Sequence, residues 1–390
     1  MRTLGVVTTS RADYGIYLPL LRRIQAEPGL ALRLLVTGMH LSPRFGMTVK
    51  SIEADGFEIA ARVKMLSNSD DPTAIVKSMA RGTAGFAEVF SRSRPDILVV
   101  LGDCFGMYVA ALAALPFKVP VAHIHGGELT EGAIDDALRH SMTKLSHLHF
   151  AATQEYGQRL VQMGEEPWRV TVSGAPSLDN LASTKLLTAP ALESRIGLRV
   201  SPETLLVTFH PATLEHEDAG RQAGELLGAL KASGRPVVFT MPNADTGGQV
   251  IREHIKRFVR EEPSAQAVES LGTEGYFSVL ALCAAMVGNS SSGLLEAPSF
   301  GLPVVNVGNR QRGRVRGVNV IDVGCGREEI VEGIRRATDP AFRRSLQGLA
   351  NPYGDGKASR RIVVKLAEVP LSGILLMKRF HDLAIPEERK

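Results

Sequence analysis

Short apolar runs recur along this chain, and stretches with helical spacing separate them. In the first half the apolar runs cover residues 4–8, 32–36, 57–63, 96–101, 119–124 and 148–152. Continuous apolar runs of this length are typical of strands that are buried on both faces of a parallel sheet. The helical stretches include residues 14–26 and 71–91, the latter opened by a capping Asp71 and a first-turn Pro72. This alternation predicts a doubly wound parallel α/β sheet, with the run 57–63 near its edge.

The second half repeats the rhythm without repeating the sequence. Its apolar runs cover residues 204–209, 236–241, 265–268, 285–287, 303–307 and 318–323. A chain of 390 residues is long for one hydrophobic core, so two domains are expected. We expect two Rossmann-like doubly wound domains that face each other across a cleft, at residues 1–175 and 176–369. An amphipathic C-terminal helix, within 370–390 and clearest over 374–383, is expected to cross back onto the first domain, or alternatively to form an oligomer contact.

Composition narrows the class of protein. Apolar residues make up 44% and charged residues 22%, as in globular proteins, and no apolar run is long enough to span a membrane. The first residues enter a strand without a signal-peptide pattern, and the three cysteines lie far apart. Both features predict a reducing, cytoplasmic location. The net charge of +4 is dispersed and there is a single Trp, which favours a small anionic ligand and argues against a nucleic-acid partner.

Polar clusters follow six of the predicted strands at the point where each strand ends. They are residues 10–14, 102–104, 123–140, 210–211, 241–245 and 288–293. Ligands of open α/β sheets bind beyond the carboxyl ends of the strands. Core packing explains one such cluster easily but six poorly, so we expect them to line one binding site.

The densest cluster is residues 123–140, with the sequence HIHGGELTEGAIDDALRH. It contains three histidines, four carboxylates and one arginine, and its Gly-Gly pair allows a ligand to approach the backbone. The spacing from Ile134 onward predicts a helix with Asp135, Asp136, Arg139 and His140 on its polar face. The alternative is an ordinary pair on the helix surface, such as Asp136 with His140.

The segment GNSSSG at residues 288–293 predicts an anion site in the second half. Free backbone N–H groups and hydroxyls at the start of a helix suit a phosphate. A plain serine cap is the alternative, but it explains only one of the three serines. Glu296 either caps this helix or accepts hydrogen bonds from ribose hydroxyls. The arginines between 310 and 316 suit a diphosphate, or else form a solvated basic loop.

Three single residues at strand ends also point to chemistry. Arg11 suits a second phosphate contact. Asp103 either caps the next helix or has a chemical task, and His210 suits a phosphate contact or acid-base work. The spacing of His123 and His125 matches no metal motif, so no metal is expected. Walker, GxSxG and GxGxxG motifs are absent, so a P-loop ATPase, an acyl hydrolase and a Rossmann dehydrogenase lose support.

Taken together, these motifs resemble the hydrolysing UDP-N-acetylglucosamine 2-epimerases of the sialic and legionaminic acid branch. The resemblance runs from about residue 3 to about residue 383. The matching segments are 11–14 (RADY), 102–103 (GD), 123–128 (HIHGGE), 132–136 (GAIDD), 139–140 (RH), 209–211 (FHP), 288–291 (GNSS) with Glu296, and 351–356 (NPYGDG).

The resemblance implies a GT-B fold, with a UDP-binding C-terminal domain, no cofactor, no metal and a homodimer or homotetramer. It implies a reaction in which a UDP-2-acetamido sugar loses UDP to give a glycal, and water then adds to release the free 2-epimer. The substrate is UDP-N-acetylglucosamine or the UDP-2,4-diacetamido-2,4,6-trideoxy sugar. The catalytic residues that it implies are Asp103, Glu128, Glu131, Asp135, Asp136, Arg139 and His210.

The same resemblance implies a second set of residues that bind UDP and the sugar. These residues are Arg11, Ala12, Gly15, His125, Asn243, Ser290, Ser291, Ser292, Glu296, Arg310, Arg312 and Arg314. Two features depart from the pattern. Many relatives carry an arginine and an acid where this chain has Cys104 and Gly106, and some carry a glutamate where it has His125. The first change suggests an altered sugar specificity. The second leaves Glu128, Glu131 or His125 to transfer a proton.

Three other functions remain open from the sequence. A non-hydrolysing 2-epimerase shares the fold and would release an epimerised UDP sugar. A GT-B glycosyltransferase would use the same UDP sugar, but it has little use for four carboxylates within residues 128–136. A catalytically silent protein would bind UDP without turnover, and the change at Cys104 and Gly106 is its only support.

Overall fold

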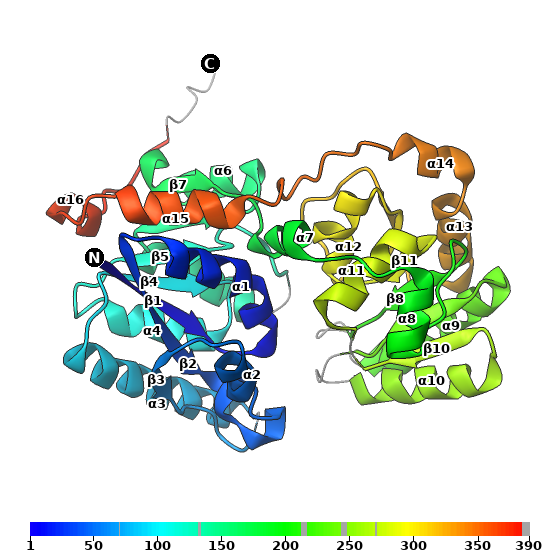
Figure 1. Cartoon of the computed structure of the whole chain (residues 1–390), viewed down its shortest axis with the longest axis horizontal. Helices are drawn as coiled ribbons and strands as arrows, with labels where there is room; N and C mark the ends of the chain where they lie inside the picture. The colour runs from blue at the N-terminus through cyan, green and yellow to red at the C-terminus, as the bar shows by residue number, and fades with distance from the viewer. Residues whose placement is uncertain (70, 132–133, 212–216, 243–247, 270, 384–390) are drawn as a thin grey trace, which may run out of the picture. The chain divides into compact units, whose positions relative to one another are not determined.

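The computed structural model describes the chain except for residues 70, 132–133, 212–216, 243–247, 270 and 384–390. It consists of two compact units (Figure 1). Unit 1 contains residues 1–128, 134–180 and 354–390, and unit 2 contains residues 129–133 and 181–353. No helix in the described part of the chain is both long and apolar enough to cross a membrane.

Unit 1 is built on a parallel sheet in the order β3-β2-β1-β4-β5-β6-β7. The first six strands lie where the apolar runs predict them, with β3 at an edge, whereas the short, partly exposed β7 was not predicted. The strands are β1 (Arg2–Thr8), β2 (Leu30–Thr37), β3 (Ile59–Val63), β4 (Ile97–Leu101), β5 (Val121–Ile124), β6 (Leu148–Ala151) and β7 (Val170–Val172).

Helices cover both faces of this sheet. The helices of the main run are α1 (Arg11–Ala26), α2 (Val49–Ala54), α3 (Pro72–Arg92), α4 (Phe105–Ala114), α5 (Ile134–Leu145) and α6 (Gln154–Gln162). Helix α7 (Asp179–Ser183) begins in unit 1 and ends in unit 2. Asp71 caps α3 as predicted, because its carboxylate accepts a hydrogen bond from the Ala74 amide. Helices α3, α4 and α5 pack in sequence in one layer. The core that they share with α1 includes every residue of β4, buried at 7% exposure or less.

Unit 2 has the second predicted sheet, also parallel, in the order β10-β9-β8-β11-β12-β13. Its strands are β8 (Leu205–Thr208), β9 (Val237–Thr240), β10 (Ala265–Val268), β11 (Ala285–Gly288), β12 (Val304–Val307) and β13 (Val320–Val323). Its helices are α8 (Ala189–Ile196), α9 (Ala219–Ser233), α10 (Gly248–Glu261), α11 (Gly272–Leu282), α12 (Ser292–Leu295), α13 (Arg327–Ala337) and α14 (Pro340–Ser345). Two hydrophobic cores, one with α9, α10 and α13 and one with α8 and α11, fill the two faces of the sheet.

Each sheet has one point where the strand order reverses. In unit 1 this point lies between β1 and β4, and in unit 2 it lies between β8 and β11. The loops that leave two such strands run in opposite directions, which opens a crevice at their carboxyl ends. The topology therefore brings residues 9–13 near residues 102–104 in unit 1, and residue 210 near residues 288–290 in unit 2.

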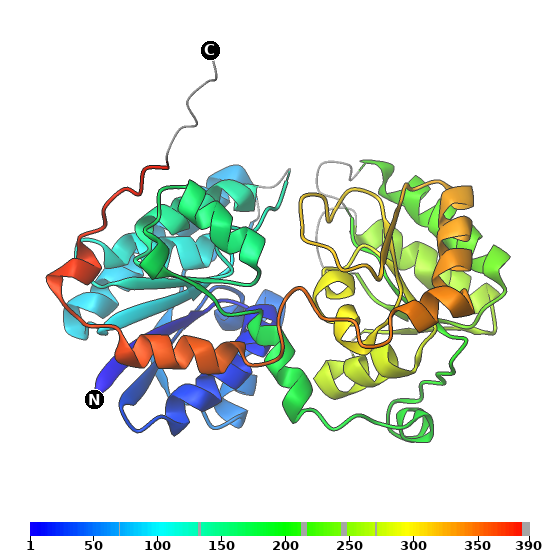
Figure 2. The same cartoon turned by 90° about the horizontal axis from the view of Figure 1, so that it is seen from above.

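The return of the chain to unit 1 begins earlier than the expected residue 370. Helix α15 (Ala358–Glu368) lies alongside α1 (Figures 1 and 2). The Asp179 carboxylate accepts hydrogen bonds from the amides of Ala358 and Ser359 at 2.9 and 2.6 Å, so it caps α15 at its first turn. The returning helix is thus α15, which sequence reasoning assigned to the second domain.

The predicted amphipathic helix over residues 374–383 is wrong. Only α16 (Gly373–Leu376) is helical, and residues 377–383 run along unit 1 without regular structure. The cause is Arg169, which is 1% exposed and donates to the carbonyls of Ile374, Leu375 and Met377 at 2.8 to 3.2 Å. These bonds hold the carbonyls of this segment on a buried guanidinium, which favours a short helical turn followed by extended backbone. Residues 373–383 are called the C-terminal strap below.

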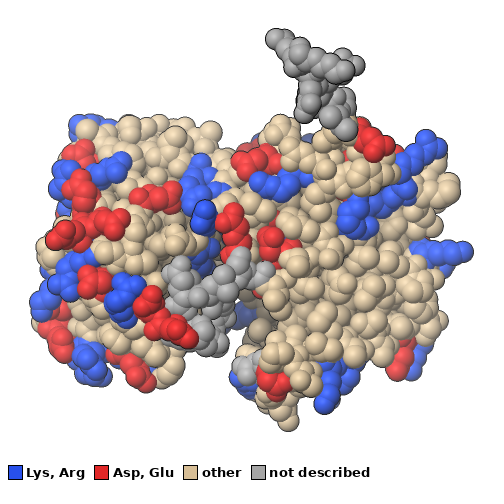
Figure 3. Space-filling view, turned by 180° about the vertical axis from the view of Figure 1, so that it is seen from behind, with Lys and Arg blue, Asp and Glu red and all other residues tan. Residues whose placement is uncertain are grey.

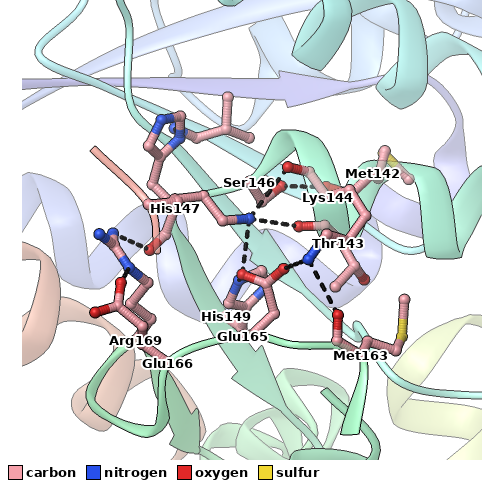
Figure 4. Close-up of polar contacts among 12 residues, drawn as sticks. Met142, Thr143, Lys144, Ser146, His147, His149, Met163, Glu165, Glu166 and Arg169 are labelled. Carbon is pink, nitrogen blue, oxygen red and sulfur yellow. Dashed lines mark hydrogen bonds and ion pairs between the residues drawn. The ribbon is translucent and has the colours of Figure 1, made fainter. Parts of the chain in front are cut away.

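A second buried contact holds the strap. Glu165 is fully buried and accepts hydrogen bonds from His149 at 2.9 Å and from Lys144 and Lys378 at 2.7 Å (Figure 4). Burial by itself would raise the pKa of Glu165, but these three donors together lower it to about 2. Since Lys378 belongs to the strap, the strap is tied to β6 and α5 through one carboxylate.

The surface charges fit the dispersed pattern of the sequence. On the face shown in Figure 3, Lys and Arg side chains lie among Asp, Glu and uncharged residues. Several charged side chains of the described residues form local pairs, such as Arg335 with Glu332 and Arg361 with Asp355. Exposed pairs of this kind contribute little to stability.

Arg169→Ala should lower the free energy of unfolding of unit 1 by about 3–5 kcal/mol, because it leaves buried carbonyls and Glu166 without their donor. Urea unfolding read by the fluorescence of Trp168, which stacks on Arg169 at 4.2 Å, measures this change. The matched control is Arg335→Ala on the surface of α13, which should have almost no effect. Equal effects of the two variants would contradict the anchoring role.

Glu165→Gln should destabilise the protein in a pH-dependent way. The pKa of Glu165 is about 2 in the folded protein and 4.5 as its ordinary value, so its stabilising contribution is complete above pH 4.5 and is lost as the pH falls toward 2. The difference in unfolding free energy between wild type and variant should therefore narrow over this interval. The exposed Glu261→Gln serves as control, and a pH-independent difference would contradict the assignment.

Candidate active site

The loop after β1 is organised by Asp13. This carboxylate, 8% exposed, accepts hydrogen bonds from Thr8, from the amide and hydroxyl of Thr9, and from Ser10, which caps α1. Burial raises its pKa. Asp13 thus holds the loop, whereas Arg11 and Ala12 are exposed and Gly15 has open space where a side chain would stand. Their predicted contact with the substrate stays a prediction.

Asp103 lies directly after β4 and is paired with Arg139 of α5. The Arg139 guanidinium, 3% exposed, donates from Nη2 to the Asp103 carboxylate and from Nη1 to the carbonyl of His125 at 2.7 Å. The Asp103 side chain remains 24% exposed. One guanidinium therefore joins the carboxyl ends of β4 and β5, and it leaves Asp103 partly accessible.

His125 and Glu128 form a buried pair on the loop after β5. The Nδ1 of His125 lies 2.5 Å from Oε1 of Glu128, whose Oε2 lies 4.0 Å from Nη1 of Arg139. Both side chains are less than 10% exposed. The backbone of His125 has φ +65°, a left-handed conformation that is uncommon outside glycine. Gly127 is required beside it, since a Cβ there would lie 2.4 Å from the Tyr156 carbonyl oxygen.

The predicted orientation of α5 was wrong. Its buried residues are Arg139, Met142 and Thr143, while Ile134 at its start is 64% exposed. The prediction from the spacing of apolar residues failed here because a buried arginine, Arg139, which is paired with Asp103, occupies a core position. Burying that charge is favourable only with partners of this kind.

The remaining acids of residues 123–140 are less enclosed. Asp135 and Asp136 lie in the first turn of α5, and Asp136 is 3.5 Å from Nε2 of His140. Glu131 pairs with Arg312 at 3.4 Å within unit 2. Gly132 and Ala133 of the motif lie outside the described residues.

His123 is a core residue, because its Nε2 contacts the Gly102 carbonyl at 2.7 Å and burial lowers its pKa to about 3. Within the described residues, no group of three or more His, Cys, Asp or Glu side chains is arranged to hold a metal ion.

The structure gives a physical reason for Gly106. A Cβ at Gly106 would lie 2.9 Å from Cγ2 of Thr9, whose hydroxyl is held by Asp13 at 2.5 Å. Cys104 lies 3.4 Å from the same hydroxyl, and burial raises the pKa of its thiol to about 12. Thr9, Cys104 and Gly106 thus form a tightly packed, uncharged cluster next to Asp103.

In unit 2, Asn289 fixes His210. The side-chain oxygen Oδ1 of Asn289 accepts a hydrogen bond from the backbone N–H of His210 at 2.7 Å. The side-chain nitrogen Nδ2 of Asn289 donates to the backbone carbonyl of His210 at 2.8 Å. Gly288 allows this approach, since it has φ +132° and a Cβ would lie 2.0 Å from the Thr208 carbonyl oxygen. His210 is therefore held at the carboxyl end of β8, beside the segment 288–293.

Asn289 also binds the loop that contains the arginines between 310 and 316. The backbone carbonyl of Asn289 accepts hydrogen bonds from Arg310 at 3.1 Å and from the buried Gln311 at 2.8 Å. The predicted helix after the serines is only α12, followed by a 3-10 turn (Ala297–Phe300) for which Glu296 is the N-cap residue. Ser290, Ser291 and Ser292 are partly exposed there, and Ser292 accepts from Tyr276 at 2.8 Å. Arg314 also lies on this loop, whereas Asn243 lies outside the described residues.

Sequence reasoning missed three residues that shape these sites. Asn289 binds both His210 and Arg310, and Gln311 donates to the backbone carbonyl of Asn289. Thr9 leaves no room for a side chain at Gly106, close to Asp103. Asn289 stands inside a noted motif, and its position after a strand was the available signal. Gln311 sits between two arginines, and nothing in its immediate sequence marks it as buried.

Comparisons with known proteins identify the family and the fold of this chain. A family model described as UDP-N-acetylglucosamine 2-epimerase matches residues 22–367. The UDP-N,N'-diacetylbacillosamine 2-epimerase (hydrolyzing) of Legionella pneumophila is 37% identical over 97% of this chain and 99% of that protein. The polysialic acid biosynthesis protein P7 of Escherichia coli is 38% identical over 99% and 98%. The structure of the Neisseria meningitidis UDP-GlcNAc 2-epimerase bound to UDP-GlcNAc has a TM-score of 0.80 at 20% identity, covering 95% of this chain and 100% of that one. The fold is therefore GT-B-like, as expected.

Gly106→Ala should lower the free energy of unfolding by about 1–3 kcal/mol, because Thr9 cannot rotate away without losing its bond to Asp13. Thermal or urea unfolding measures the change. Gly224→Ala, in α9 with open space around it, is the matched control and should be neutral or stabilising. Adding Thr9→Ser removes the clashing methyl and should restore most of the loss. A neutral Gly106→Ala variant would contradict the packing argument.

Proposed function

Because the chain belongs to the UDP-N-acetylglucosamine 2-epimerase family, we propose that it is a hydrolysing 2-epimerase. It eliminates UDP from a UDP-2-acetamido sugar and then adds water, which releases the free sugar with inverted configuration at C2. The relatives named above as hydrolysing, or as acting in polysialic acid biosynthesis, support this proposal over most of the chain.

The observation that carries the proposal is the array of Asp103, Arg139, His125 and Glu128 at the carboxyl ends of β4 and β5. The reaction needs a proton removed from C2 and another delivered to it. Asp103 is the proposed base, since it is partly exposed and held by a guanidinium that always keeps its charge. Asp135, Asp136 and Glu131 are proposed to assist from the same loop and helix.

Unit 2 is proposed to bind UDP. The departing diphosphate develops negative charge, which cationic and N–H groups stabilise. Arg310, Arg312 and Arg314 supply cations, and Ser290, Ser291 and Ser292 supply hydroxyl and backbone donors. His210, held by Asn289, is proposed to contact the phosphates, and Glu296 the ribose. Arg11, Ala12 and Gly15 of unit 1 and Asn243 are proposed as further substrate contacts.

We propose UDP-N,N'-diacetylbacillosamine, a 2,4-diacetamido-2,4,6-trideoxy sugar nucleotide, as the first substrate to test, with UDP-N-acetylglucosamine as the second. The uncharged cluster of Thr9, Cys104 and Gly106, where many relatives carry an arginine and an acid, supports an altered sugar specificity. The product would then serve legionaminic or sialic acid synthesis. We further propose a cytoplasmic homodimer or homotetramer. The three cysteines form no disulfide, which supports the location but has no bearing on the oligomer.

The decisive experiment is incubation with each UDP sugar in D2O, followed by NMR. Free UDP together with a free 2-epimer that carries deuterium at C2 is the expected result. An intact UDP sugar with deuterium at C2 would instead indicate a non-hydrolysing epimerase. No turnover of either sugar, with UDP still bound, would refute the proposed activity.

Asp103→Asn should reduce UDP release at least 100-fold, because the amide cannot accept the C2 proton. UDP affinity, measured by calorimetry, should stay within a few-fold of wild type, since the proposed UDP contacts lie mainly in unit 2. Asp382→Asn, at an exposed position of the C-terminal strap, is the control for an Asp-to-Asn change. Turnover that survives in Asp103→Asn would remove Asp103 from proton transfer.

A further inference from the structure

The proposed reaction needs two proton-transfer groups. Inversion at C2 requires that the proton leaves one face of the carbon and that another arrives at the opposite face, so one carboxylate does not suffice. Asp103 is the proposed base, and it accepts from Arg139. The identity of the group that returns the proton rests on the proposed function, and the structure favours one residue.

That residue is His125, because one of its ring nitrogens has a fixed partner and the other has none. Nδ1 lies 2.5 Å from the Glu128 carboxylate, which can only accept, so Nδ1 carries a hydrogen. Nε2 is buried and has no hydrogen-bond partner among the described residues. A buried polar atom without a partner is costly, and a ligand that meets it recovers this cost.

The backbone of His125 is also held in an unusual state. Its φ of +65° is strained for a residue with a side chain, and its carbonyl accepts from Arg139 at 2.7 Å. The same guanidinium pairs with Asp103. Asp103 and His125 therefore lie on neighbouring strands on either side of one buried cation, which fixes them relative to each other as two groups acting on one carbon must be fixed.

We propose that His125 is the catalytic acid that returns the proton to C2, and that Glu128 is a positioning residue which acts through it. In the first step, the Asp103 carboxylate takes the C2 proton. The electron pair of that C–H bond forms the C1=C2 bond, and the C1–O bond breaks with its electrons leaving on UDP.

In the second step, Nε2–H of His125 gives its proton to C2 of the glycal from the opposite face. The oxygen of a water molecule bonds to C1, and a proton of that water restores His125. Asp103 releases its proton to solvent. The sum is one UDP sugar and one water converted to UDP, a proton and the free 2-epimer.

The test is His125→Asn, which keeps an N–H near the position of Nδ1 for Glu128 but lacks Nε2. This variant should still release UDP at a rate within about ten-fold of wild type, and it should accumulate the 2-acetamidoglycal. Formation of the free 2-epimer should fall by at least 100-fold. Conversely, Asp103→Asn should fail to release UDP but should still hydrate added glycal. NMR of the products separates these outcomes.

Controls keep a structural effect distinct from a chemical one. His254→Asn, on α10 where Nδ1 of the ring contacts the Val250 carbonyl one helix turn earlier, should behave as wild type. Glu128→Gln keeps an acceptor for Nδ1 but removes its charge, and it should also accumulate glycal. The inference is overturned if His125→Asn and Glu128→Gln form free sugar and UDP in the wild-type ratio, or lose UDP release and glycal hydration together. A failure of the proposed function is distinguishable, since wild type itself would then release no UDP.

Discussion

The arrangement of unit 1 at its functional end depends on the burial of Arg139. A guanidinium that is 3% exposed needs partners, and two of them are Asp103 after β4 and the carbonyl of His125 after β5. These partners set the turn of α5 about its own axis and hold His125 in a left-handed conformation. Removing one partner would leave a buried charge, so the three segments are constrained together.

A similar principle holds the end of the chain. Arg169 and Glu165 are both almost fully buried, and each bonds groups of the C-terminal strap and groups of unit 1. In both places a single buried charged side chain organises several segments that are distant in sequence. Such contacts are favourable only when all partners are present, which gives the strap and the active-site loop one defined arrangement.

Much of the fold followed from local sequence. The positions of twelve strands and the cap of α3 were predicted, because buried parallel strands and helix starts have strong local signals. The exposed β7 has no such signal. The strap was wrongly predicted to be a helix, and the wrong face of α5 was predicted to be buried. In both cases the contacts of a buried arginine decided the local structure against the periodic spacing of apolar residues. Arg139 binds Asp103, which is 36 residues away, and Arg169 binds Leu375, which is more than 200 residues away.

The sequence by itself determined the two doubly wound sheets, the family and the residues gathered at the strand ends, since apolar runs and short motifs are local properties. Only the tertiary structure decided that Asp13 holds a loop, that Gly106 has no room for a side chain and that Nε2 of His125 is left without a partner. These features depend on distances between segments that the strand order brings together, and no local pattern encodes such distances.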